Sequence, residues 1–256
     1  MPSSPGRYGS LNPLTKATLA TVATLGAFVL GGYVGPLAIL GGLVLPGAVA
    51  AGRLARTVRL GFLLSLPISV SVALVSVFTR PGATVLFVIG PFDATLEGVD
   101  FAAQVILRVF VVAMALTLFG LTTEPRAFVV DLERRGLPPR VAFAAAATLE
   151  TIPLMVQRAA AIVAAQRARG LDTEGSPLAR LRGVMPMVGP VILSSLTEVE
   201  ERSLALEVRA FGRPGSRHLL WSLPDSSPER ALRWALLVAL AIVLVTRATG
   251  TFPALP

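Results

Sequence analysis

The chain has 256 residues, of which 54% are hydrophobic and only 15% are charged. Its mean hydropathy is +0.72, whereas soluble domains are about a quarter charged and rarely this apolar. A core of this size cannot bury so much apolar surface. The composition therefore excludes an ordinary soluble protein and requires lipid.

The net charge and the missing residue types narrow the function classes further. A net charge of +8 could indicate a nucleic-acid binder, but there is no aqueous fold to carry it, so we expect no nucleic-acid partner. The chain has no cysteine, which excludes disulfides, thiolate metal sites and thiol nucleophiles. His218 is the single histidine, which argues against paired histidine ligands. We expect no metal site and no catalytic residue.

Uncharged stretches predict five short transmembrane helices. The first uncharged stretch, 17–52, is long enough for two spans, and a Gly/Pro turn from Gly31 to Pro36 divides it. The predicted helices cover about 17–32, 36–51, 60–79, 101–121 and 231–246. The apolar segment from Pro81 to Phe92 is too short to cross, so we expect a re-entrant or interfacial loop there.

The distribution of positive charge predicts which side of the membrane each segment occupies. Placing the N-terminus inside puts twenty of the 23 Lys and Arg residues on the cytoplasmic side, as short cytoplasmic loops favour. The opposite side then carries the acidic residues Asp93, Glu97 and Asp100. We expect a multi-pass protein of a prokaryotic inner or plasma membrane, with the C-terminus outside.

Arg108 lies inside the predicted fourth span. A charge within a span is costly and often marks a transport pathway or a buried ion pair. The alternative is that Arg108 extends to the outer interface, about two turns away, or pairs with an exterior carboxylate such as Asp100.

The chain divides into an N-terminal membrane region (1–121), a charged cytoplasmic region (122–229), and a C-terminal helix with a tail (230–256). In the cytoplasmic region, the hydroxyls of Thr122 and Thr123 and the ring of Pro125 predict the start of a short helix. That helix should end near Arg135, before Gly136.

Two long helices should follow in the cytoplasmic region. The first runs from about Pro139 to Arg169 and is too apolar for a surface helix, so it must pack against other helices or the membrane surface. The second runs from Ser194 to Phe211, with Glu198 and Arg202 spaced for an exposed face. The apolar segment between them contains Pro186 and Pro190 and is too short to span.

The two long helices end in similar sequences. Ala168-Arg169-Gly170, preceded by Arg167, closes the first, and Glu207-Val208-Arg209-Ala210-Phe211-Gly212 closes the second. Arginine in a last turn complements the helix dipole, and glycine commonly stops a helix. The functional alternative is that each end presents a guanidinium to a carboxylate or carbonyl on a partner. Two similar ends would then imply two similar receptors.

In order along the chain, these motifs resemble the T component of energy-coupling factor importers, a family of ABC-type vitamin and metal uptake systems. Leu11-Asn12-Pro13-Leu14-Thr15-Lys16 is similar to the family's motif before the first span, and Leu121-Thr122-Thr123-Glu124-Pro125 to the segment leading into its coupling helices. Leu137-Pro138 and Ile152-Pro153-Leu154 resemble its first coupling stretch. Ala168-Arg169-Gly170-Leu171-Asp172 reproduces its Ala-Arg-Gly motif.

The sequence departs from the family at two positions. Arg209 is followed by Ala210 where the family has glycine, and the next glycine is Gly212. Glu150 stands where the family often has arginine.

The resemblance implies an all-α, polytopic membrane scaffold with a cytoplasmic pair of long coupling helices. Arg169 and Arg209 would dock on two ABC-type ATPase subunits, supported by Arg167 and Glu207. A small membrane S component would bind the substrate and cover the apolar faces of the coupling helices. ATP and magnesium would be bound by the ATPases and not by this chain. Lys16 is the only lysine, so no lysine-containing phosphate loop is present elsewhere.

Two other classes are considered. A stand-alone secondary transporter would place polar groups at mid-membrane on broken helices, and apart from Arg108 the spans lack them. A membrane-embedded enzyme would need a cluster of carboxylate or histidine side chains at the membrane face, and the sequence offers none.

Overall fold

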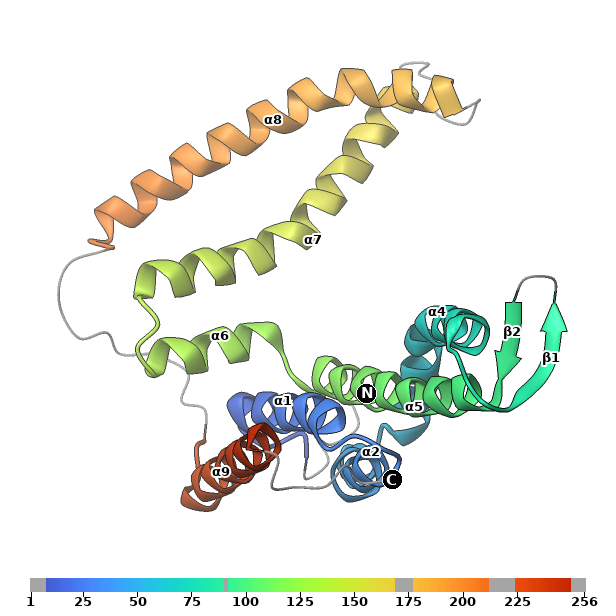
Figure 1. Ribbon diagram of the computed structural model, residues 1–256. Coiled ribbons are helices and arrows are strands. Elements are labelled where there is room, and N and C mark those ends of the chain that lie inside the picture. The colour runs from blue at the N-terminus through green and yellow to red at the C-terminus, as the bar shows by residue number, and fades with distance from the viewer. Residues whose placement is uncertain (1–7, 90–91, 169–176, 212–223, 250–256) are drawn as a thin grey trace. The chain divides into compact units, whose positions relative to one another are not determined.

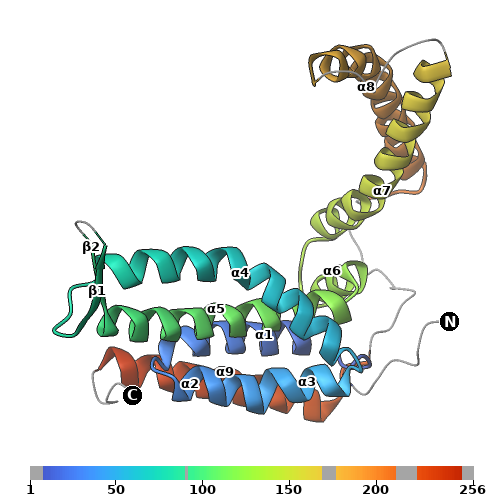
Figure 2. The ribbon, with the colours of Figure 1, turned by 90° about the vertical axis from the view of Figure 1, so that its right-hand side faces the viewer.

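A computed structural model describes residues 8–89, 92–168, 177–211 and 224–249. The chain forms two compact units, Met1–Phe128 with Ser222–Pro256, and Val129–Trp221. We call them the membrane unit and the long-helix unit and describe each separately (Figures 1 and 2). The described residues are almost entirely helical, which confirms the predicted all-α polytopic fold.

The membrane unit is built from apolar helices that begin and end close to the predicted bounds. They are α1 (Pro13–Val29), α2 (Val34–Ile39), the π-helical turn η1 (Leu40–Val44), α3 (Leu45–Ala50), α4 (Leu54–Thr79), α5 (Leu96–Thr122) and α9 (Ser227–Ala248). The elements α2, η1 and α3 follow one another without a break and correspond to the predicted second helix. Pro46 lacks an N–H, and the π turn directly before it widens the helix there.

Within the described residues, four helices are long and apolar enough to cross a membrane, namely α4, α5, α9 and part of α7. The elements α1 and α2 to α3 are apolar but shorter. The sequence-based prediction placed the segment of α7 outside the bilayer, although its length and composition alone would allow a span.

The segment after α4 differs from the expected loop. Strands β1 (Val85–Ile89) and β2 (Phe92–Thr95) pair antiparallel and form a hairpin. The β-branched residues Val85, Val88 and Ile89 favour this extended backbone. Thr95 then caps α5, because its hydroxyl accepts a hydrogen bond from the Gly98 amide at 3.1 Å.

The core of the membrane unit consists mainly of small side chains between α1, η1 and α5. Ala23, Ala27, Val44, Val111 and Met114 are almost completely buried. Their small size allows the helices to approach closely, as is typical of helix packing in lipid.

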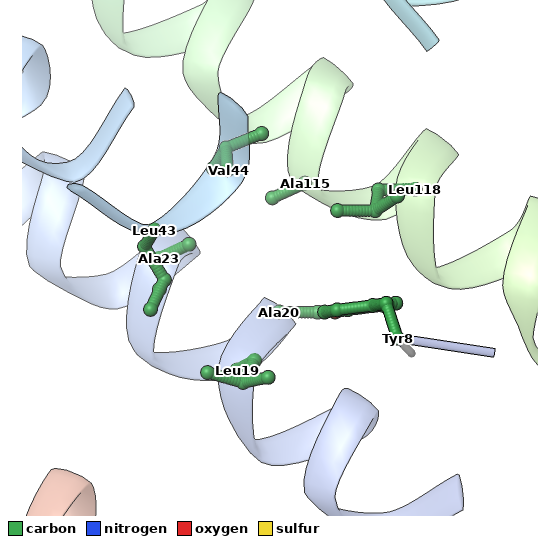
Figure 3. A pocket seen from close by; sticks show the side chains of 8 residues that line it. All are labelled: Tyr8, Leu19, Ala20, Ala23, Leu43, Val44, Ala115 and Leu118. Carbon is green, nitrogen blue, oxygen red and sulfur yellow. The ribbon is translucent and has the colours of Figure 1, made fainter. Parts of the chain in front are cut away.

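A second cluster lies nearer the N-terminus and lines a small apolar pocket (Figure 3). Tyr8 packs there beside Leu19 of α1 and Leu118 of α5. Burial raises the pKa of Tyr8 to about 12, because the charged phenolate would lose its hydration there. This pocket lies at the same end of the membrane unit as the N-terminal motif.

The long-helix unit contains α7 (Pro139–Ala168) and α8 (Pro177–Val208). The boundary between the units falls inside α6 (Pro125–Arg134). As predicted, α6 stops before Gly136, which has a φ of +111°. The helix predicted over Ser194–Phe211 is wrong at its start, because α8 continues through Pro186 and Pro190. Each proline removes only one backbone hydrogen bond, and the remaining turns hold the helix together.

Gly61 lies at a close approach of α4 to α5. A Cβ atom at this position would lie 2.7 Å from the Met114 Cγ and 3.2 Å from its Cα. Because the Cα belongs to the backbone, a larger residue would have to push the two helices apart.

We predict that Gly61→Ala lowers the stability of the chain by about 1–3 kcal/mol, as overpacking does. The matched control is Gly120→Ala in α5, where a Cβ would meet nothing within 4 Å. Alanine there should be neutral or slightly stabilising, since it favours helix over glycine. Thermal unfolding of the detergent-solubilised chain measures both. Equal melting temperatures for the two variants would contradict the close approach.

Candidate functional site

The two long helices are joined by a charged cluster in the middle of their length. Glu198 of α8 accepts hydrogen bonds from Arg158 of α7 and from Arg202, the latter at 2.8 Å. The Glu198–Arg202 pair was predicted from its spacing as an exposed face. The contact to Arg158, forty positions away along the chain, had no local signal in the sequence. This bridge ties α7 to α8 through side chains.

An aromatic pair fixes how the two helices run. The rings of Phe143, in the first turns of α7, and Phe211, just after α8, lie with centroids 4.8 Å apart. The end of α8 therefore packs beside the start of α7, and the two helix ends predicted to dock lie at opposite ends of the pair. At about 1.5 Å per residue, the 32 residues of α8 span about 48 Å.

The end of α8 is a tightly closed helix stop. The Phe211 amide donates to the Leu206 carbonyl and the Ala210 amide to the Glu207 carbonyl, each at 2.9 Å. Ala210 has a φ of +55°, and among the described residues it is the only one other than glycine with a positive φ. These bonds form a Schellman motif with Ala210 where glycine usually stands. Gly212 lies outside the described residues.

Another helix stop in this chain has the same geometry with glycine. The helix stop after α6 has the same two bonds, from Leu137 to Leu132 and from Gly136 to Glu133, each at 3.1 Å. There Gly136 follows Arg135 as Ala210 follows Arg209. Ala210 therefore has the positive φ at its helix stop that Gly136 has at the other.

The arginine at this stop is exposed to solvent. Arg209 has no ion pair with any described residue, and its neighbour Glu207 is also exposed. At the other end of the pair, Ala168 is the last residue of α7 and Arg167 is exposed. Arg169 and Gly170 lie outside the described residues.

The N-terminal motif forms a buried polar cluster with α9. The Asn12 side chain accepts from the Leu14 amide at 2.9 Å and so caps α1, with Pro13 in the first turn. The backbone N–H of Asn12 donates to the Glu229 carboxylate at 2.8 Å. Arg233 donates to the Thr15 hydroxyl at 2.9 Å and to Asp225 at 2.8 Å. Asn12, Thr15 and Arg233 are buried, so these bonds keep their polar groups from being left without a partner.

Lys16 and Arg53 hold the end of α5. Lys16 is 3% exposed, and its ammonium donates to the Gly9 and Thr122 carbonyls at 2.8 and 2.9 Å. Arg53 donates to the Leu121 carbonyl at 2.7 Å. Two cations therefore cap the negative end of this helix dipole, at the point where the chain leaves the membrane unit.

The segment leading into α6 differs from the prediction at its two threonines. Thr122 is the last residue of α5, and its hydroxyl bonds back to the Leu118 carbonyl at 2.7 Å. The buried Thr123 hydroxyl has no hydrogen-bond partner among the described residues. The two hydroxyls therefore do not cap α6, which starts at Pro125 as its ring favours. The preceding helix runs one residue longer than predicted, so that Thr122 belongs to it and Thr123 is its C-cap.

Comparison with known proteins identifies relatives. The family described as CbiQ, cobalt transport protein, matches residues 10–219. The energy-coupling factor transporter transmembrane protein EcfT of Exiguobacterium sibiricum is 33% identical over 181 residues, 66% of each chain. The EcfT of Leuconostoc gelidum is 31% identical over 140 residues, 51% of this chain and 52% of that one. The EcfT of Thermosediminibacter oceani is 26% identical over 230 residues, 86% of each chain.

The chain spans between half and two thirds of the length of the first two relatives. The family match, in contrast, runs from before α1 to beyond α8 and so covers most of the chain. Together with the apolar helices of the membrane unit, this match shows a multi-pass cell-membrane protein that belongs to the CbiQ/EcfT family, the transmembrane T components of energy-coupling factor transporters.

Proposed function

We propose that this chain transmits ATP-driven motion from two ATPase subunits to a substrate-binding S component, and so drives import of a vitamin or a metal ion. The two ATPases bind ATP and magnesium, and this chain is a non-catalytic scaffold. The long-helix unit and the N-terminus lie in the cytoplasm, with the C-terminus outside. Membership in the family supports this proposal, which adds the identity of the partner subunits and the inward direction of transport.

The observation that carries the proposal is the exposed apolar surface of the long helices. Side chains that are more than half exposed include Ile152 and Val156 on α7 and Ile192, Leu193, Leu196, Val199, Leu204 and Val208 on α8. Two helices of this composition would not remain bare in water, because large exposed apolar patches mark interaction sites. The S component covers this surface in the proposed complex.

The docking role falls on the two helix ends. Arg169, with Arg167, Ala168 and Gly170, serves one ATPase, and Arg209, with Glu207, Ala210 and Gly212, serves the other. Support comes from the position of these ends at opposite ends of the α7–α8 pair and from the exposed, unpaired Arg209 among the described residues. A guanidinium suits such contacts, since its fork can bind a carboxylate or carbonyl with several donors.

Movement of the ATPases would reach the S component through the helices themselves. The Glu198 bridge to Arg158 and the ring contact between Phe143 and Phe211 join α7 to α8 in the middle and at one end. A displacement at either docking end therefore acts on both helices. The S component, held on their apolar faces, then reorients and releases its substrate inward.

The experiment that tests this function is purification of the chain from its native membrane with its partners attached. We expect two ATPase chains and one small hydrophobic subunit to co-purify. Substrate uptake by the chain alone in liposomes would refute the scaffold role and favour a secondary transporter.

We predict that Arg169→Glu combined with Arg209→Glu abolishes association with the ATPases. A charge-assisted contact contributes about 1.5–3 kcal/mol, so losing two should weaken binding about 100-fold or more. The control is Arg56→Glu with Arg59→Glu, which changes the net charge equally at exposed positions of α4, outside the long-helix unit. Co-purification yields measure both. Normal ATPase recovery with the first variant would disprove docking through these arginines.

We predict opposite effects for two substitutions of Ala210. A positive φ destabilises alanine by about 1 kcal/mol and β-branched residues by more, whereas glycine adopts it without a penalty. Ala210→Gly should therefore preserve or strengthen ATPase binding, while Ala210→Val weakens it by misdirecting Arg209. Binding titration of purified ATPase to each variant measures the effect. If valine binds as tightly as glycine, the helix stop does not orient the docking arginine.

A further inference from the structure

Two arginines from different helices converge on one turn of the membrane unit. The turn is formed by Gly31 and Gly32, with φ of +65° and +54°, directly after α1. A Cβ at Gly31 would lie 2.8 Å from the Arg247 Nη2 and 4.0 Å from the Arg108 Nη2. Glycine is needed here both for its backbone angle and for the space that the guanidinium of Arg247 occupies.

The Gly31–Gly32 turn lies at the end of the membrane unit that is far from the N-terminal motif. Figure 2 shows the turn after α1, the beginning of α5 and the end of α9 on the same side of this unit. Arg247 lies in the last turn of α9, whereas Arg108 lies three turns inside α5 and reaches the turn from there. In a bilayer, the ends of α1 and α9 mark the level of the headgroups.

Neither guanidinium has an anionic partner within the described part of the chain. Arg247 donates from Nε to the Val29 carbonyl at 3.1 Å. Arg108 donates from Nη2 to the Gln104 side-chain oxygen at 3.4 Å, and its buried Nε has no partner. The pairing of Arg108 with Asp100 considered from the sequence does not occur.

The nearby carboxylate is already engaged. Asp100 accepts from the Tyr33 hydroxyl at 2.7 Å and from the Gln104 amide at 2.9 Å. Gln104 therefore stands between Asp100 and Arg108. The other carboxylate of this helix end, Glu97, accepts from the Ala83 and Thr84 amides before the hairpin. Among the described residues, the two positive charges are therefore brought together without a carboxylate that pairs with either of them.

We propose that Arg108 and Arg247, beside the Gly31–Gly32 turn, bind a phosphate group. Two guanidinium forks present several N–H donors in a geometry that suits phosphate oxygens. A phosphate would neutralise two like charges that are otherwise placed close together, one of them within a membrane helix. Its source is either the headgroup of an anionic lipid or free phosphate, and the chemistry at the two arginines is the same.

The test compares the full chain in nanodiscs of phosphatidylglycerol and of phosphatidylcholine with identical acyl chains. Native mass spectrometry after delipidation counts the lipids that remain bound. We expect the wild-type chain to retain phosphatidylglycerol preferentially, and Arg108→Gln and Arg247→Gln each to reduce that retention about tenfold, as loss of a charge-assisted bond does. The matched control is Arg80→Gln, directly after α4. The guanidinium carbon of Arg80 lies 3.7 Å from the centroid of the Phe101 ring.

A second arm distinguishes the two sources. Inorganic phosphate is titrated into the lipid-free chain in detergent while its melting temperature is followed. A rise that the Arg108 and Arg247 variants lack supports a free-phosphate ligand, and lipid retention without such a rise supports a headgroup. The proposal is overturned if the wild-type chain neither prefers phosphatidylglycerol nor responds to phosphate. It is also overturned if Arg80→Gln loses as much lipid as the other two. The first of these outcomes is measured on the wild-type chain alone, so it does not depend on whether the variants fold.

Discussion

The ammonium of Lys16 is the interaction on which the organisation of this protein depends. It lies buried between the Gly9 and Thr122 carbonyls, so it fixes the start of α1 to the end of α5. A buried charge without such bonds would be very costly, and the negative end of the α5 dipole makes this site favourable for a cation. One turn along the chain, Asn12 fixes the same end to α9 through Glu229. Helices from the beginning, middle and end of the sequence thus meet where α5 passes toward α6.

This polar junction has a mechanical consequence for the rest of the membrane unit. In lipid there is little hydrophobic force between helices, and association depends on close packing and hydrogen bonds. The small residues Ala23 and Ala27 and the close approach at Gly61 supply the packing. The polar junction supplies the hydrogen bonds. It lies beside the end of α5, where force from the long helices would reach the membrane unit. A firm anchor at that point means that displacement of α6 moves the end of α5 rather than unwinding it.

The elements set by hydrophobic length were predictable from the sequence, and those set by contacts between distant residues were not. Uncharged stretches located α4, α5 and α9, and Gly136 located the end of α6. Thr122 and Thr123 were misassigned because hydroxyls before a proline indicate a helix start, while here the preceding helix runs on to include Thr122. The bond from Asn12 to Glu229 joins residues 217 positions apart, and no local pattern predicts it. Among the candidate docking residues, the sequence indicated Arg209 but could not show that Ala210 supplies the reversal.

The position of Ala210 bears on how the proposed docking would work. Alanine with a positive φ is strained by about 1 kcal/mol, so this conformation persists only because the surrounding contacts hold it. Those contacts are the two bonds of the helix stop and the ring of Phe143 against Phe211. Since Phe143 belongs to α7, the direction of Arg209 at the end of α8 depends on the start of the other helix. A change in the packing of α7 on α8 would therefore reorient Arg209, and by reciprocity a partner that holds Arg209 would bias that packing. The same strained residue thus links docking to the helix pair that carries the motion.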